Sequence, residues 1–160
     1  MDRFILIAVE IISLINLLEA QLINLDDKVI TNCRNSQNRT IRQIVGHMVD
    51  SATNNTHRII HLQNLTSPVV YPNYASDGNN DRWIAIQNFQ EEDWATLVQL
   101  WKYSNLHVAH VIKNLDTRKL QNLWIAGTDQ LVSLEEMVVD YTRHLKLHLN
   151  EIDELISDNI

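Results

Sequence analysis

The segment Tyr141–Ile152 reads YTRHLKLHLNEI and carries two histidines, His144 and His148, four residues apart. Just upstream, Ser133 and Glu136 have the S-x-x-E spacing of a capping box, which predicts that a helix begins here. Four residues of an α-helix advance by about 6 Å and ~40°, so both imidazoles project from one face.

The face that carries both histidines is also the apolar face of this helix. Its apolar residues recur at helical spacing and predict a buried stripe of Leu134, Met137, Val138, Tyr141, Leu145, Ile152, Leu155 and Ile156. Two buried imidazoles are costly unless their nitrogens find partners. A divalent metal would supply one, since neutral imidazole binds zinc, nickel, copper and iron. Hydrogen bonds to neighbouring side chains are the alternative, and this segment alone favours neither.

Length and composition set limits on the kind of protein. The 160 residues suffice for a single domain, 1–160, with a real core, and the three glycines and two prolines favour long helices. The net charge of −7, without a basic stripe, argues against nucleic-acid binding. A single cysteine, Cys33, rules out an internal disulfide framework and predicts a reducing, cytoplasmic location.

Hydrophobic periodicity predicts an all-α protein with four long helices and no significant sheet. A second capping box, Thr40-x-x-Gln43, marks the start of the second helix, and an acidic run at 90–93 marks the start of the third. We expect the helices at 2–24, 40–64, 94–115 and from 134 onward. A polar connection at 26–39 and long irregular crossovers at 65–89 and 116–132 would join them.

The first predicted helix is apolar over more of its circumference than one bundle core needs. This pattern predicts either a central helix or one shared with a second copy, and we expect a homodimer. Glu10 and Glu19 interrupt the apolar residues, and no uninterrupted run reaches the ~20 that a membrane span requires. We therefore expect neither a membrane segment nor a signal peptide.

The seven histidines include three pairs with metal-compatible spacing. On a helical wheel, the pairs at 57/61 and 107/110 lie away from the apolar stripes, whereas His144 and His148 lie on the inward face. His47 lies at the edge of the second helix's stripe and is the natural third ligand. Three ligands with an open fourth position would suit a zinc-like catalytic site.

Three carboxylates lie at the edges of the same inward faces. Asp50, Asp140 and Glu151 could accept hydrogen bonds from the ligand imidazoles and so orient them. An edge carboxylate can equally be solvated. No Ser/His/Asp or Cys/His nucleophile arrangement stands out, so no catalytic residue is assigned.

The run Thr40–Ser51, TIRQIVGHMVDS, resembles the second-helix signature of DinB-like four-helix proteins, in particular the YfiT-like metal-dependent hydrolases. That signature ends in a ligand histidine followed by x-x-D-S, which matches His47, Asp50 and Ser51. The segment at 141–152 resembles the family's second signature, with two metal histidines four residues apart. Tyr71 and Trp83 resemble an aromatic pair of the family's long crossover, and the likeness extends over essentially the whole chain.

Three positions depart from the family pattern. Arg39 stands where a tryptophan is common, and Leu147 and Glu151 stand where further histidines are common. All three expected ligands are nevertheless present.

The resemblance implies an up-down-down-up bundle with a nickel or zinc site between the second and fourth helices, held by His47, His144 and His148, and frequent dimers. Related enzymes transfer a low-molecular-weight thiol to an electrophile or isomerise small acids with a thiol cofactor. We therefore expect a metal-dependent hydrolase or thiol S-transferase that acts on a small molecule. Two alternatives stay open: a non-catalytic metal- or ligand-binding helical dimer, and a structural bundle whose core histidines are hydrogen-bonded.

Overall fold

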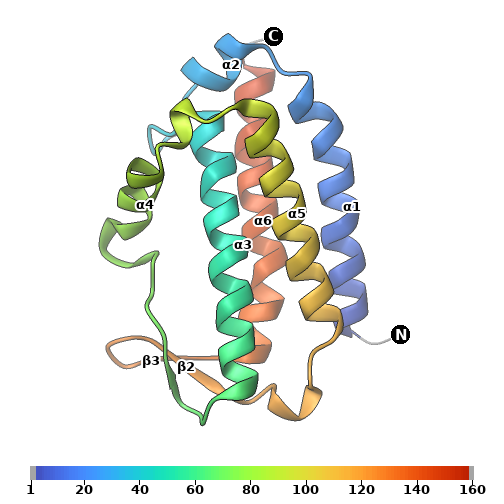
Figure 1. The fold of residues 1–160 in the computed structure, drawn as a ribbon, viewed down its shortest axis with the longest axis vertical. Helices are drawn as coiled ribbons and strands as arrows, with labels where there is room; N and C mark the ends of the chain where they lie inside the picture. Colours follow the sequence, from blue (N-terminus) through green and yellow to red (C-terminus); the bar gives the residue numbers. More distant parts are fainter. Residues whose placement is uncertain (1–2, 159–160) are drawn as a thin grey trace.

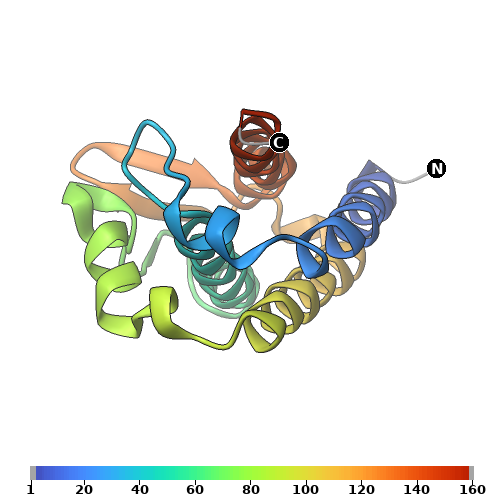
Figure 2. The ribbon, with the colours of Figure 1, turned by 90° about the horizontal axis from the view of Figure 1, so that it is seen from above.

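The computed structural model describes residues 3–158 and is built around four long helices that lie side by side (Figure 1). Seen along the bundle in Figure 2, α1 lies between α5 and α6, and α3 lies on the opposite side. The bounds of these helices are α1 Arg3–Ile23, α3 Ile41–Asn64, α5 Trp94–Lys113 and α6 Leu134–Ser157. The prediction of a helical bundle with four long helices is confirmed.

Both capping boxes form as the sequence predicts. Thr40 and Gln43 exchange side-chain and backbone hydrogen bonds at the start of α3, and Ser133 and Glu136 do the same at the start of α6. These bonds satisfy backbone N–H groups that a helix start otherwise leaves unpaired. They fix where the two helices that carry the candidate ligands begin.

The three connections contain more regular structure than the sequence suggests. Their elements are α2 Asp27–Asn32, β1 Val69–Val70, η1 Ser76–Gly78, α4 Asn79–Gln87, η2 Phe89–Glu91, η3 Thr117–Lys119, β2 Leu123–Gly127 and β3 Gln130–Ser133. The strands form one small sheet in the order β1-β2-β3, with β1 parallel and β3 antiparallel to β2. The prediction of no significant sheet is therefore wrong for the two long crossovers, which contain these strands.

The missed elements are too short to show a clear period. α2 has six residues and one buried side chain, Ile30, and α4 likewise buries only Ile84 within its bounds. α4 begins after Gly78 and ends before Asn88, and these two flanking residues are in the left-handed region at φ 69° and 52°. α4 is part of the crossover between α3 and α5 and lies on the outer side of α3 (Figure 1).

The core follows the predicted stripes. Every residue of the stripe on α6 is buried, and Trp101 of α5 is the largest fully buried side chain. A polar pair spans the core, where the Tyr141 hydroxyl donates to Asn105 Oδ1 at 2.7 Å and Asn105 Nδ2 donates to the Trp101 carbonyl at 2.8 Å. The Tyr141 hydroxyl and the Asn105 side chain both find partners. Their contact therefore ties α6 to α5 and leaves neither of these polar groups unpaired.

Helix α1 is long and apolar enough, by length and composition, to cross a membrane, although the sequence led us to expect no such segment. About 33% of its most apolar window is buried, and the apolar core helix of a soluble protein or a signal sequence passes the same test. Here α1 packs on α5 and α6. Lys102 of α5 forms an ion pair with Glu19 at 2.8 Å, and Trp94 Nε1 donates to the Leu22 carbonyl at 2.9 Å.

Candidate metal centre

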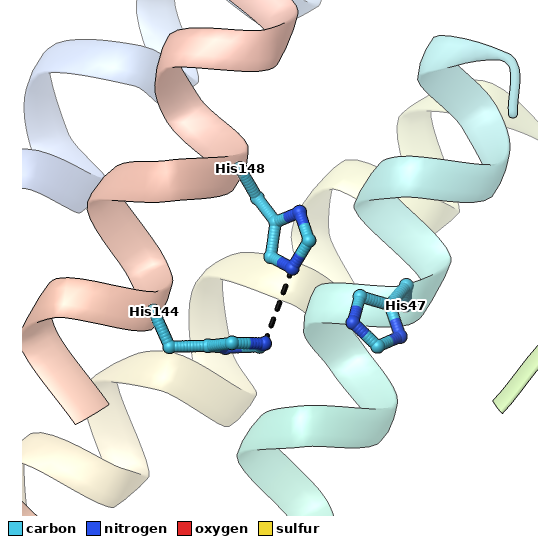
Figure 3. Close-up of side chains that lie close together, drawn as sticks. All are labelled: His47, His144 and His148. Carbon is cyan, nitrogen blue, oxygen red and sulfur yellow. Dashed lines mark hydrogen bonds between the residues drawn. The ribbon is translucent and has the colours of Figure 1, made fainter. Parts of the chain in front are cut away.

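Three imidazoles from two neighbouring helices converge inside the bundle (Figure 3). His47 comes from α3, and His144 and His148 come from successive turns of α6. One ring nitrogen from each lies within 4.8 Å of the other two. The Nε2 atoms of His144 and His148 are 3.2 Å apart. The structure thus brings together the three histidines that the sequence singles out.

The spacing of these nitrogens fits a tetrahedral metal. Two nitrogens that each lie about 2.05 Å from a tetrahedral ion are about 3.3 Å apart. The observed separation of 3.2 Å between His144 Nε2 and His148 Nε2 is close to this value. A nitrogen of His47 lies within 4.8 Å of both of them.

Burial keeps the imidazoles in the form that binds metal. It lowers the pKa of His47 to about 2 and that of His144 to about 4, helped in each case by the charge of His148. Burial also lowers the pKa of His148, which the hydrogen bond to Glu151 opposes. His47 Nδ1 is buried without a hydrogen-bond partner. Such an orphaned polar atom often marks a place where a water or ion binds.

Hydrogen bonds behind the cluster orient two of the rings. His148 Nδ1 donates to the Glu151 carboxylate at 2.9 Å, which leaves Nε2 to face the other imidazoles. His144 Nδ1 lies 3.4 Å from the Ser51 hydroxyl of α3, so its Nε2 also faces the cluster. This is the arrangement in which an outer partner fixes the tautomer of a metal-binding histidine.

The other two predicted carboxylates have different partners. Asp50 is buried on α3 and accepts a hydrogen bond from Gln87 Nε2 at 2.7 Å, while its Oδ2 has no partner. Burial raises the pKa of Asp50 to about 6. Asp140 is exposed and forms an ion pair with Arg143. Of the three, Glu151 is the one that is hydrogen-bonded to a candidate ligand.

The remaining histidines lie away from the cluster, as the helical wheel indicates. His57, His107 and His110 are exposed, and His61 is half-buried against the ring of Tyr71, with 5.2 Å between the ring centroids. Within residues 3–158, none of them joins a second group with metal-binding geometry.

A cavity of about 270 Å³ lies beside His144. Its walls come from α3, α6, the crossover after β1, and β2 and β3. Sequence reasoning did not single out several of the residues in its walls, among them Arg58, Tyr74 and Trp124. Arg58 could have been found, because it follows His47 by eleven residues, three helical turns, and therefore shares its inward face. Tyr74 and Trp124 lie in segments without a helical period.

The fold and the cluster define the class as a bundle of four long helices with three converging histidines between the second and the fourth of them. No family model matches the sequence. A protein of Halalkalibacterium halodurans named "Putative metal-dependent hydrolase BH0277" is 24% identical over 157 residues, which cover 92% of this chain and 82% of that protein.

The solved structure of YfiT from Bacillus subtilis, described as "a probable metal-dependent hydrolase with an unusual four-helix bundle topology", is similar with a TM-score of 0.77. The match covers 96% of this chain and 84% of YfiT at 19% identity, and it shows that the two share a fold. The sequence resemblance to YfiT-like metal-dependent hydrolases is confirmed.

Proposed function

We propose that this protein binds one divalent metal through His47, His144 and His148 and uses it to hydrolyse a small molecule or to transfer a thiol to one. The observation that carries the proposal is the convergence of three imidazoles, those of His47 and His148 buried and that of His144 half-buried beside a cavity. The name of the Halalkalibacterium relative and the description of YfiT both refer to metal-dependent hydrolysis. They favour the hydrolase, whereas the thiol transferase rests on the sequence resemblance.

A zinc or nickel ion held by three histidines would keep an open position, where it would polarise a substrate oxygen or lower the pKa of a bound water or thiol. The chain's own groups prepare the site. Glu151 holds the ring of His148, and Ser51 contacts His144. Burial raises the pKa of Tyr74 to about 12, so its hydroxyl keeps its proton at neutral pH and can donate a hydrogen bond within the cavity.

We also propose that the bundle runs up-down-down-up. The colour sequence in Figure 1 supports this order, since α1 and α6 run toward the end of the bundle that holds α2, and α3 and α5 run away from it. In this topology the long crossovers 65–93 and 114–133 leave from the same end and form the cavity walls.

Metal titration of the purified protein tests the proposal. Protein stripped with a chelator should bind one equivalent of zinc or nickel by calorimetry, and His144→Ala and His148→Ala should each abolish stoichiometric binding. His107→Ala and His110→Ala provide matched controls, because this exposed pair also has metal-compatible spacing. Equal binding before and after the His144 and His148 substitutions would refute the site.

Turnover separates an enzyme from a binding protein. The metal-loaded protein should hydrolyse small esters or amides, or transfer a low-molecular-weight thiol to an electrophile, and the stripped protein should not. Stoichiometric metal binding without turnover across both substrate panels would favour the alternative, a non-catalytic metal-binding helical protein.

A further inference from the structure

Arg58 is an arginine buried within α3 on the wall of the cavity. Its residue is 6% exposed, and its guanidinium carbon lies 3.8 Å from the centroid of the Trp124 ring and 5.7 Å from that of Tyr71. Burial lowers its pKa to about 10. The side chain therefore stays positively charged at neutral pH.

This buried charge has no counter-ion within residues 3–158. No carboxylate forms an ion pair with Arg58 there, and its Nε and Nη2 have no hydrogen-bond partner. Nη1 contacts only a weak acceptor, the sulfur of Met137, at 4.0 Å. The three nitrogens of the guanidinium thus lack a strong acceptor among the side chains described.

The aromatic contacts compensate only part of this burial. A desolvated cation–π contact contributes less free energy than withdrawing an ion from water costs. A purely structural role would be met as well by an apolar side chain of similar volume, which often stabilises a core when it replaces a buried charge. An unpaired cation in a cavity wall is instead expected of a site that binds an anion.

The pair of unpartnered nitrogens indicates how an anion would bind. Nε and Nη2 form the side edge of the guanidinium, the fork that binds two oxygens of a carboxylate or a phosphate in parallel, and the small volume of the cavity favours the smaller carboxylate. We propose that Arg58 binds the carboxylate of a small organic acid in the cavity beside His144. The inference rests on the proposed function in one respect, namely that the metal site acts on another group of the same acid.

The rest of the cavity suits such a ligand. Its volume of about 270 Å³ is near the lower end for ligand pockets, ~300–1,000 Å³, which favours a molecule of metabolite size. Asn73 lines the wall and is held by bonds to the Ala126 carbonyl at 3.0 Å and from the Ala75 N–H at 3.2 Å. The carboxylate of Asp140, which also lines the cavity, is neutralised by its ion pair with Arg143.

Met137 lines the cavity, and its sulfur contacts Nη1 of Arg58 at 4.0 Å. Both unpartnered nitrogens are shielded from bulk water, so the carboxylate reaches them when a neighbouring side chain moves. Met137 is unbranched and adapts readily to a new packing arrangement. A change of its rotamer would make room beside the guanidinium without moving the backbone.

Tryptophan fluorescence tests the inference, because Trp124 stacks directly on the guanidinium. The metal-free and zinc-loaded proteins are titrated with acetate, succinate, inorganic phosphate and uncharged acetamide at constant ionic strength. Acetate and succinate should each produce a saturable change, and acetamide and phosphate should not. Absence of saturation by about 50 mM carboxylate, well above a millimolar Kd, would overturn the inference. Phosphate binding as tight as carboxylate binding would overturn the assignment to an organic acid.

Substitutions identify the residue responsible. Arg58→Met should lower the carboxylate affinity at least tenfold and leave Tm unchanged or higher. Arg58→Lys keeps the positive charge but lacks the two-pronged guanidinium, and it should weaken carboxylate binding by a similar factor. It provides the test if the methionine variant fails to fold. Arg118→Met, at an exposed arginine on η3, is the control and should bind like the wild type. Unchanged carboxylate binding by either Arg58 variant would overturn the inference.

The two proposals fail separately in this design. Zinc binding without carboxylate binding would remove the inference about Arg58 and leave the metal site standing. Carboxylate binding that depends on Arg58, in a protein that binds no zinc, would support the anion pocket and refute the metal-dependent function.

Discussion

At the scale of single residues, Glu151 is the carboxylate whose position gives it a clear role. It accepts the Nδ1–H of His148 and is itself contacted by Asn35 Nδ2 at 3.3 Å. A carboxylate in this place fixes the ring and increases the basicity of the nitrogen that faces the cluster.

Glu151→Gln should lower zinc affinity by about 10- to 100-fold, because the amide is a weaker acceptor for the Nδ1 proton. A competition titration against a chromogenic chelator measures this change. Glu154→Gln, at an exposed position on the same helix, is the matched control. An equal effect of both substitutions would indicate a general charge effect and contradict the role of Glu151.

Asp50 provides a second test at this scale, through stability. Its pKa is raised to about 6 by burial in the folded protein, against 3.8 in an unfolded chain. Between these values the folded state retains a proton that the unfolded state has lost, so the stability contribution of Asp50 falls as pH rises from about 4 to 6. The total change is about 3 kcal/mol for a shift of roughly two pKa units.

In metal-free protein, Asp50→Asn should therefore be close to wild type in stability near pH 4 and more stable by up to about 3 kcal/mol at pH 7. Denaturant unfolding at several pH values measures the difference. The Asn carbonyl can still accept the hydrogen bond from Gln87, which keeps the contact to α4. A difference that stays constant over this range would contradict the raised pKa.

At the scale of elements, Gly46 determines how closely η2 approaches α3. A Cβ at this position would overlap the ring of Phe89, which is buried on η2. The glycine thus lets an aromatic side chain rest directly on the helix backbone one residue before His47. The crossover that leads to α5 is held to α3 by this contact.

Gly46→Ala should destabilise the protein by about 1–3 kcal/mol through overpacking, despite the better helix propensity of alanine. Thermal and denaturant unfolding measure the effect. Gly127→Ala is the control, since a Cβ there would meet its nearest neighbour, Gln130 Oε1, at an ordinary 3.7 Å. Gly46→Ala combined with Phe89→Ala should cost less than the sum of the single changes, because the clash is gone.

The elements also show what sequence reasoning could reach. The four long helices and their starts were predictable because amphipathic stripes of about 20 residues and two capping boxes are local signals. The same stripes separated His144 and His148 from the exposed histidines. α2, α4 and the three strands were missed because each is too short for a period to emerge, and β1 pairs with β2 across more than 50 residues of chain.

The residues of the cavity walls also divide into those that helical spacing predicts and those that it does not. Its wall residues on α3 and α6 follow from helical spacing, and Arg58 lies on the same face as His47. Tyr74 and Trp124 reach the cavity only through the folding of the crossovers. Their positions depend on tertiary contacts, such as the hydrogen bond from Trp124 Nε1 to the Tyr71 carbonyl at 2.9 Å.

At the scale of the whole molecule, α1 leaves one apolar face uncovered. Leu6, Val9, Ile12, Leu17 and Ile23 are exposed on this helix, and Leu17 is 75% exposed. Ion pairs with α5 and α6, at Glu19 and Glu10, hold the helix in the bundle by its other faces. The uncovered face therefore points away from the protein's own core.

We propose that this face is covered by α1 of a second copy in a homodimer. A twofold dimer pairs the same patch on both subunits, so a single apolar helix face can complete the contact. Leu17→Glu would place a charge in this contact on each subunit. By light scattering at micromolar concentration, the wild type should therefore be dimeric and the variant monomeric.

Ile86→Glu supplies the control for this experiment, because Ile86 is 81% exposed on α4, on the opposite side of the bundle (Figure 2). It should leave the dimer intact. A wild-type protein that is a clean monomer at micromolar concentration would refute the dimer. Flotation of that monomer with lipid vesicles, lost in Leu17→Glu and retained in Ile86→Glu, would instead assign the apolar face of α1 to a membrane surface, which its length and composition also allow.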